Sequence, residues 1–340
     1  YALGVMFFEM LSGNLPAEYS HNLYTRWGSN QEPDPKLQEG ERYETDLSKL
    51  FVDVEAGDYR PAPGSPLIDA GAAVDVTEDF DGTPYGLHGE SALVPWDARV
   101  TEDSAEAVEL TLATDLVRYP FALERTLRLP ADDARLDVTE SVTNEGGVEL
   151  AYAWQQHLAL GAPLLGPDAR LDVPAATGVT ESVDGSLETG RLADERTFDW
   201  PVAPTRDGGT TDLREVPPED AALHDQCYAT DLDAGWYALT NPTLDLGFAF
   251  TFPTDPFECV WYWQALGGMA EAPYWGRNYN VGLEPTTAYP LDTDAQRANG
   301  TTKTLAPGET VEASFTARTY GGVEAVPVVS PAEGVTAREP

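Results

Sequence analysis

The stretch Val108-Glu109-Leu110-Thr111-Leu112 alternates apolar and polar side chains. The same alternation recurs at residues 121–129 around Arg125, at 136–138 and at 311–317. A period of two over successive segments indicates antiparallel strands that bury one face. No segment of comparable length with a helical period occurs in this part of the chain, so we predict an all-β sandwich of many strands.

The composition is strongly acidic. The chain of 340 residues has 42% hydrophobic residues, enough for a core in one large or two ordinary domains. It carries 58 acidic and 20 basic residues, a net charge of -38, and only three lysines. This charge opposes compaction by self-repulsion, which high salt screens, and the pattern is typical of proteins from extreme halophiles. A surface this negative repels nucleic acid and anionic lipid, so we expect neither as a partner.

The cysteines, the lengths of the apolar runs and the first residues of the chain limit the class of protein further. Cys227 and Cys259 form no metal-binding pattern, and they either pair across neighbouring strands or are simply buried. No apolar run reaches 18 residues, so no transmembrane helix is indicated. The chain begins at Tyr1 without a signal-peptide pattern, which indicates a fragment or a processed product.

Residues 1–85 differ from the rest, being rich in turn residues and poor in alternating runs. Gly64-Ser65-Pro66-Leu67-Ile68-Asp69-Ala70-Gly71, together with segments near residues 19–24, 51–60 and 79–82, resembles the closing turns of a right-handed parallel β-helix. The resemblance implies a structural cap at the end of a solenoid. We therefore expect three parts: residues 1–85, a domain at 86–325 and a tail at 326–340.

Two short segments each set one ionisable side chain among apolar neighbours: Trp154-Gln155-Gln156-His157 and Gly282-Leu283-Glu284-Pro285. An imidazole and a carboxylate together can move protons in both directions. A third segment, Gly86-Leu87-His88-Gly89-Glu90, lies upstream. The chain therefore has candidates for an acid and a base.

With residues 119–125 and 142–144, these three segments occur in the order seen in aldose 1-epimerase (galactose mutarotase-like) proteins, which the chain resembles over about residues 86–320. The resemblance implies a β-supersandwich that interconverts the α and β anomers of a hexose. It implies Glu284 as the base, His157 as the acid and His88 as a ligand of sugar hydroxyls, with no metal or organic cofactor. The first strands of such epimerases are not recognisable in residues 1–85.

Further candidates for sugar binding are aromatic or polar. Trp261-Tyr262-Trp263-Gln264 belongs to the densest aromatic region, and sugar rings stack on flat side chains. In this strand we expect Trp261 and Trp263 on the buried side and Tyr262 on the other, with Trp263 and Gln264 near the ligand. Trp154 and Arg125 are also candidates for substrate binding. We expect His21 and His224 at the surface.

Two other functions remain open. The domain could be a carbohydrate-binding module without catalysis, or an accessory domain of a polysaccharide lyase or hydrolase, since one fold hosts several activities. In each case the partner is a small sugar or a carbohydrate chain end. A cytoplasmic location of a halophile suits an epimerase, whereas a native β-helix part suits secretion. The sugar and the oligomeric state stay open.

The net charge of -38 predicts stabilisation by salt. We expect the melting temperature to rise steadily between 0.1 and 2 M KCl, because screening weakens repulsion among the carboxylates. Differential scanning calorimetry measures this directly. A melting temperature independent of KCl would contradict the interpretation.

Overall fold

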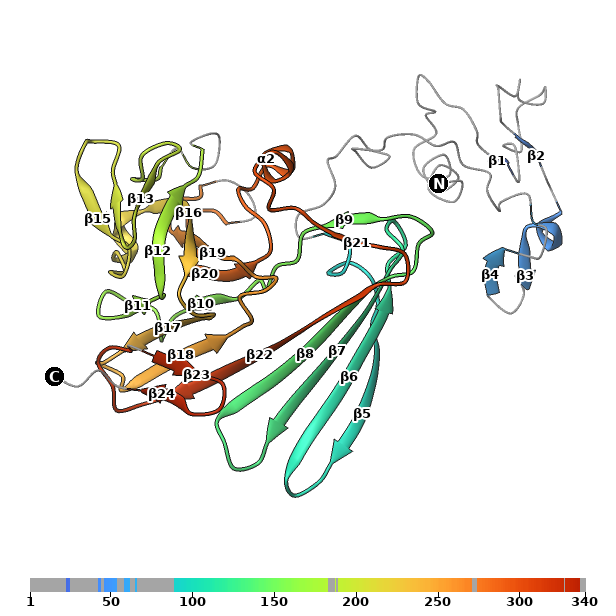
Figure 1. Cartoon of the computed structure of the whole chain (residues 1–340), viewed down its shortest axis with the longest axis horizontal. Coiled ribbons are helices and arrows are strands. Elements are labelled where there is room, and N and C mark those ends of the chain that lie inside the picture. The colour runs from blue at the N-terminus through green and yellow to red at the C-terminus, as the bar shows by residue number, and fades with distance from the viewer. Residues whose placement is uncertain are drawn as a thin grey trace. The chain divides into compact units, whose positions relative to one another are not determined.

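A computed structural model of the chain shows two compact units, residues 1–89 and 90–340 (Figure 1). It describes residues 23–24, 42–43, 46–53, 58–61, 65, 89–182, 187, 189–270, 274–326 and 328–336. Most residues behind the β-helix resemblance lie outside these ranges, as do His21 and His88, so that resemblance stays a prediction.

The described part of the first unit is small. It comprises two short strand pairs and one 3-10 turn. The parallel pair is β1 (Leu23–Tyr24) with β2 (Arg42–Tyr43), the turn is η1 (Leu47–Lys49), and the antiparallel pair is β3 (Phe51–Asp53) with β4 (Asp58–Pro61).

The second unit contains two large antiparallel sheets, which confirms the all-β prediction. The eight-stranded sheet has the order β11 (Arg170–Asp172), β17 (Trp236–Asn241), β18 (Leu246–Thr251), β22 (Thr310–Tyr320), β8 (Arg135–Asn144), β7 (Phe121–Pro130), β6 (Ala107–Asp115), β5 (Asp97–Asp103). The six-stranded sheet has the order β10 (Ala159–Gly161), β20 (Tyr279–Thr286), β19 (Cys259–Leu266), β16 (Leu223–Leu232), β12 (Ala175–Thr180), β13 (Thr197–Asp199).

The second unit also contains smaller elements outside the two large sheets. They are three strand pairs, one 3-10 turn and one short helix: β14 (Val202–Pro204) with β15 (Thr210–Asp212), β21 (Lys303–Leu305) with β9 (Leu150–Tyr152), β23 (Val328–Ser330) with β24 (Gly334–Thr336), η3 (Glu219–Ala221) and α2 (Thr293–Ala298). No helix in the described ranges is long and apolar enough to cross a membrane.

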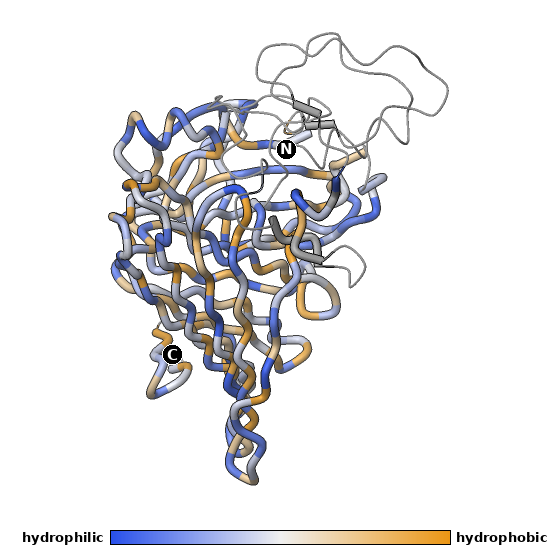
Figure 2. Tube along the Cα trace, turned by 90° about the vertical axis from the view of Figure 1, so that its right-hand side faces the viewer, coloured by the Kyte–Doolittle hydropathy of each residue, from blue (hydrophilic) through white to orange (hydrophobic). Residues whose placement is uncertain are grey.

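The alternating segments of the sequence form β6, β7, β8 and β22. Leu110, Leu127, Val138 and Phe315 lie opposite one another in register across these four strands, so they share one face. That face is buried at Phe315 but opens toward the β5 edge of the sheet, where Val100, opposite Leu110, is 61% exposed. The tube in Figure 2 shows the alternation of hydrophobic and hydrophilic residues along the strands.

The core lies between the two sheets. Phe250 and Phe315 of the eight-stranded sheet stack with ring centroids 5.7 Å apart, and Tyr262 and Leu283 of the six-stranded sheet belong to the same cluster. Cys227 and Cys259 are both free and buried, so the second of the two alternatives for the cysteines holds.

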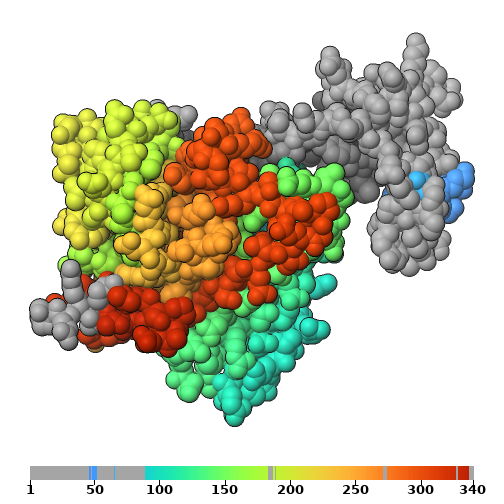
Figure 3. Space-filling model, viewed as in Figure 1, coloured from blue at the N-terminus to red at the C-terminus, as the bar shows by residue number. Residues whose placement is uncertain are grey.

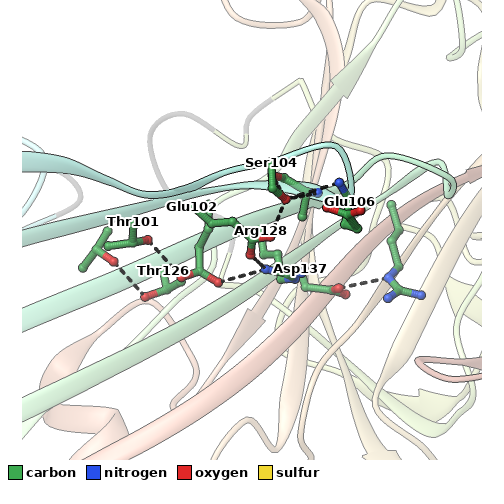
Figure 4. Close-up of polar contacts among 11 residues, drawn as sticks. Thr101, Glu102, Ser104, Glu106, Thr126, Arg128 and Asp137 are labelled. Carbon is green, nitrogen blue, oxygen red and sulfur yellow. Dashed lines mark hydrogen bonds and ion pairs between the residues drawn. The ribbon is translucent and has the colours of Figure 1, made fainter.

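The other face of the eight-stranded sheet is polar near its β5 edge (Figure 4). Arg128 pairs with Glu102, and its Nη1 atom lies 3.4 Å from an oxygen of Glu109. Most of β5 is exposed, and a shift of register between Val100 and Glu102 marks a bulge in its pairing with β6. The free edge of the sheet is therefore both charged and irregular.

The predicted tail at 326–340 includes the β23–β24 hairpin. Val326 and Val329 pack against Trp236, Ala238 and Ala249 of the eight-stranded sheet. Figure 3 shows the hairpin in dark red at the surface of the second unit. The described part of this segment thus packs on the eight-stranded sheet through a small apolar cluster.

Candidate functional site

The candidate site lies on the outer face of the six-stranded sheet, the side turned away from the core. In the register of β19 and β20, Trp261 lies opposite Glu284 and Trp263 opposite Gly282, while Tyr262 lies opposite the core residue Leu283. Tyr262 is buried and both tryptophans are partly exposed. The expectation that the tryptophans take the buried side was therefore wrong, because the core between the sheets takes Tyr262.

Glu284 and His157 lie together on this face. His157 Nδ1 is 3.3 Å from Glu284 Oε1, and the Gln155 side-chain amide donates a hydrogen bond to Glu284 Oε2. Glu284 is only 3% exposed. Burial raises the pKa of its carboxyl to about 8, because removal from water disfavours the charged form. The pair predicted from two distant segments is thus in contact.

Backbone pairing to β20 brings His157 to Glu284. Gln155 bridges to Thr286, and Ala159 pairs with Gly282, so the intervening segment runs antiparallel along β20. The amide of Leu283 donates to the carbonyl of Leu158 at 3.0 Å. The ladder therefore fixes His157 beside Glu284.

Gly282 makes room for the carboxylate. A Cβ atom at this position would lie 2.3 Å from Glu284 Oε1 and 3.3 Å from the Cβ of Trp263. The Glu284 side chain therefore folds back over Gly282, directly opposite Trp263. Any side chain at residue 282 must displace it.

Trp154 and Arg125 meet at a second buried carboxylate, Glu140, which the sequence did not single out. Trp154 Nε1 and Gln156 Nε2 donate to Glu140 Oε2 at 3.2 and 2.6 Å, and Arg125 Nε donates to Oε1. The Trp154 ring also packs on Phe315 in the core, with ring centroids 6.3 Å apart. The structure thus joins these two predicted sugar ligands to Glu140.

Alternation in the segment 154–157 explains this division. Trp154 and Gln156 contact Glu140, whereas Gln155 and His157 contact Glu284. The alternation is visible in the sequence and could have separated the two groups. The acceptor, Glu140, gave no signal because it is one of many acidic residues on alternating strands.

Trp263 lies among three other rings on the outer face. Its ring centroid lies 6.5 Å from that of His157, 6.2 Å from that of His224 and 6.1 Å from that of Tyr274. Trp263 Nε1 donates to His224 Nε2 at 2.8 Å. His224 is buried, so its predicted surface position was wrong: β16 sets it beside Trp263.

Gln264 lies on the other side of β19. It is fully buried, and its Oε1 atom accepts from Arg191 Nη2 at 2.9 Å. Arg191 is in turn held by Asp225, with Nε 3.2 Å from Oδ2. Successive residues of a strand face opposite sides, so Trp263 and Gln264, both expected near the ligand, lie on opposite faces of the sheet. No group of His, Cys, Asp and Glu in the described part of the chain is arranged to hold a metal ion.

Comparison with known proteins identifies the family. Residues 64–318, which are 255 of the 340 residues, match the family described as domain of unknown function DUF4432. The chain therefore belongs to this family. A search of curated proteins gives no match.

Solved structures establish the fold. A putative aldose 1-epimerase from Klebsiella pneumoniae has a TM-score of 0.54 and 18% identity over 72% of this chain and 59% of its own, so the match spans about three fifths of that protein. One from Escherichia coli K12 has a TM-score of 0.50 and 18% identity over 77% of this chain and 88% of its own. The predicted galactose mutarotase-like fold is confirmed.

We predict that Gly282→Ala destabilises the protein by about 1–3 kcal/mol through overpacking. The added methyl group meets the Glu284 carboxylate, so most of this loss should vanish when Glu284→Ala is the background. Urea denaturation of the four proteins in this cycle measures the coupling. Gly161→Ala is the control, because its nearest contact would be an ordinary 3.5 Å. Equal losses in both backgrounds would contradict the packing argument.

Burial of Glu284 also predicts a pH dependence of stability. The carboxyl is protonated in folded and unfolded chains below about pH 4.5, and its pKa is about 8 in the folded chain. Wild-type stability should therefore fall between these pH values, on the order of a few kcal/mol in total. Glu284→Gln lacks this contribution, so its stability relative to the wild type should improve as pH rises from 4.5 to 8. A difference that does not change with pH, in denaturation at several pH values, would refute the prediction.

Proposed function

We propose that this protein is an aldose 1-epimerase that interconverts the α and β anomers of a hexose by acid–base catalysis. The observation that supports the proposal most directly is the contact between the buried Glu284 carboxyl and His157, 3.3 Å apart beside Trp263. The fold shared with putative aldose 1-epimerases agrees with it. The surroundings are suited to a sugar, whose C–H face can stack on the indole.

The reaction needs one base and one acid. Glu284 as carboxylate takes the proton from the anomeric hydroxyl, and the C1–O1 bond becomes a carbonyl. The bond between C1 and the ring oxygen breaks, and its electron pair stays on that oxygen, which receives a proton from the His157 imidazolium. Rotation about C1–C2 presents the other face of the aldehyde. The reverse proton transfers close the ring and restore both groups.

The environment of Glu284 is suited to this role. A base is most effective when its pKa lies near the working pH, and burial raises the pKa of Glu284 to about 8. The carboxylate is then a stronger base than an exposed glutamate. His157 Nδ1 lies 3.3 Å from Oε1, so the base and the acid are close enough to act on the same sugar ring.

Polarimetry of freshly dissolved α-galactose and α-glucose in molar KCl tests the proposal. We expect the wild type to accelerate mutarotation, and Glu284→Gln and His157→Ala each to lower kcat by 100-fold or more, the range of general acid–base catalysis. Glu312→Gln, the same change at an exposed position of β22, should keep the wild-type rate. Because the mechanism needs the Glu284 carboxyl ionised and the His157 imidazole protonated at once, the kcat/KM of the wild type should pass through a maximum as pH is varied and fall on either side of it.

The outcome separates the proposed function from its alternatives. A folded protein that binds sugar without accelerating mutarotation would be a binding module. In that case Glu284→Gln would leave the affinity unchanged. Cleavage of a polysaccharide chain would identify the accessory domain of a lyase or hydrolase.

A further inference from the structure

Three neighbouring strands of the six-stranded sheet present a row of side chains on the outer face. Gln226 on β16 lies directly opposite Trp263 on β19, and Trp263 lies opposite Gly282 on β20. The Glu284 carboxylate folds over Gly282. The row therefore has an amide at one end, an indole in the middle and a carboxylate at the other end.

Each end of the row holds a buried polar atom that makes no hydrogen bond to any residue the structure describes, although His157 Nδ1 lies 3.3 Å from the one at the Glu284 end. These atoms are Gln226 Nε2, a donor, and Glu284 Oε1, an acceptor. Buried polar groups are nearly always satisfied, so such atoms call for an explanation. A ligand that accepts at one end and donates at the other would satisfy both.

The distance between the ends limits the ligand. Adjacent strands are about 4.8 Å apart, so Gln226 and the position of the carboxylate are separated by roughly 10 Å across two strand spacings. Two hydrogen bonds of about 2.8 Å leave roughly 4 Å between the ligand oxygens. This is more than the separation of hydroxyl oxygens on adjacent ring carbons, so one sugar ring lying over Trp263 would offer two non-adjacent hydroxyls to the two groups.

We propose that Gln226 is a sugar-binding residue of this site, and that its amide donates to the hydroxyl on C4, the ring carbon opposite the anomeric carbon. The inference rests on the proposed function for the orientation, because Glu284 acts on the anomeric hydroxyl. It adds a residue that sets specificity: the configuration at C4 decides how well its hydroxyl meets the Gln226 amide.

Isothermal titration calorimetry with galactose and with its 4-deoxy analogue tests this contact. For the wild type, loss of the C4 hydroxyl should raise Kd about tenfold, since the Gln226 amide then lacks its acceptor. Gln226→Met, similar in size but apolar, should raise Kd for galactose about tenfold and bind the two sugars within twofold of each other. Gln296→Met, the same change within α2 and outside the row, should bind galactose as the wild type does.

The comparison of two proteins with two sugars forms a double-mutant-type cycle, which tests the contact of Gln226 by binding alone and without measuring catalysis. If loss of the C4 hydroxyl raises Kd by the same factor in the wild type and in Gln226→Met, the proposed contact is overturned. A protein that shows the expected cycle but no mutarotation supports the contact and refutes the proposed epimerase. Absence of saturable binding by folded wild-type protein overturns both. Melting temperatures of the variants confirm that each is folded.

Discussion

The burial of the Glu284 carboxyl determines which residues can surround it on the outer face of the six-stranded sheet. A carboxyl removed from water costs free energy unless its oxygens gain partners, and here Gln155 and His157 approach it from one side while Gly282 leaves it space. The backbone ladder between residues 155–161 and β20 supplies these neighbours. The same backbone pairing that adds residues 155–161 to the edge of the sheet also places His157 beside Glu284.

The segment 154–157 connects two carboxylates in different sheets. Glu140, on β8 of the eight-stranded sheet, accepts from Trp154 and Gln156, and Glu284, on β20, accepts from Gln155. Glu140 accepts from three donors, whereas Glu284 Oε1 makes no hydrogen bond to any described residue, with His157 Nδ1 3.3 Å away. The first arrangement suits anchoring and the second suits proton transfer. The contrast supports an anchoring role for Glu140 and agrees with the catalytic role proposed for Glu284.

The alternating pattern predicted the strands, and the two segments singled out in the sequence bring His157 and Glu284 into contact, but the sequence did not predict which side of the strand at residues 259–266 is buried. Alternation was sufficient for β6, β7, β8 and β22 because their apolar residues share one face. It failed at residues 261–264, where both faces carry large aromatic side chains and only the opposing sheet decides which is buried. Gln226 and Glu140 were missed because an isolated polar residue in a strand has no local signature. Glu140 stands out only through its donors Trp154 and Gln156, and Gln226 only through its position opposite Trp263 on the neighbouring strand.

The edge strand β5 carries both charge and a bulge. Like charges keep the open edges of two sheets apart in dilute buffer, but near molar salt the screening length shrinks to about 3 Å and this repulsion acts only at contact. A bulge interrupts the regular spacing of backbone donors and acceptors, and that interruption is independent of ionic strength. Near molar salt, any resistance of β5 to pairing with a strand of a second molecule would therefore depend on its bulge rather than on its charge.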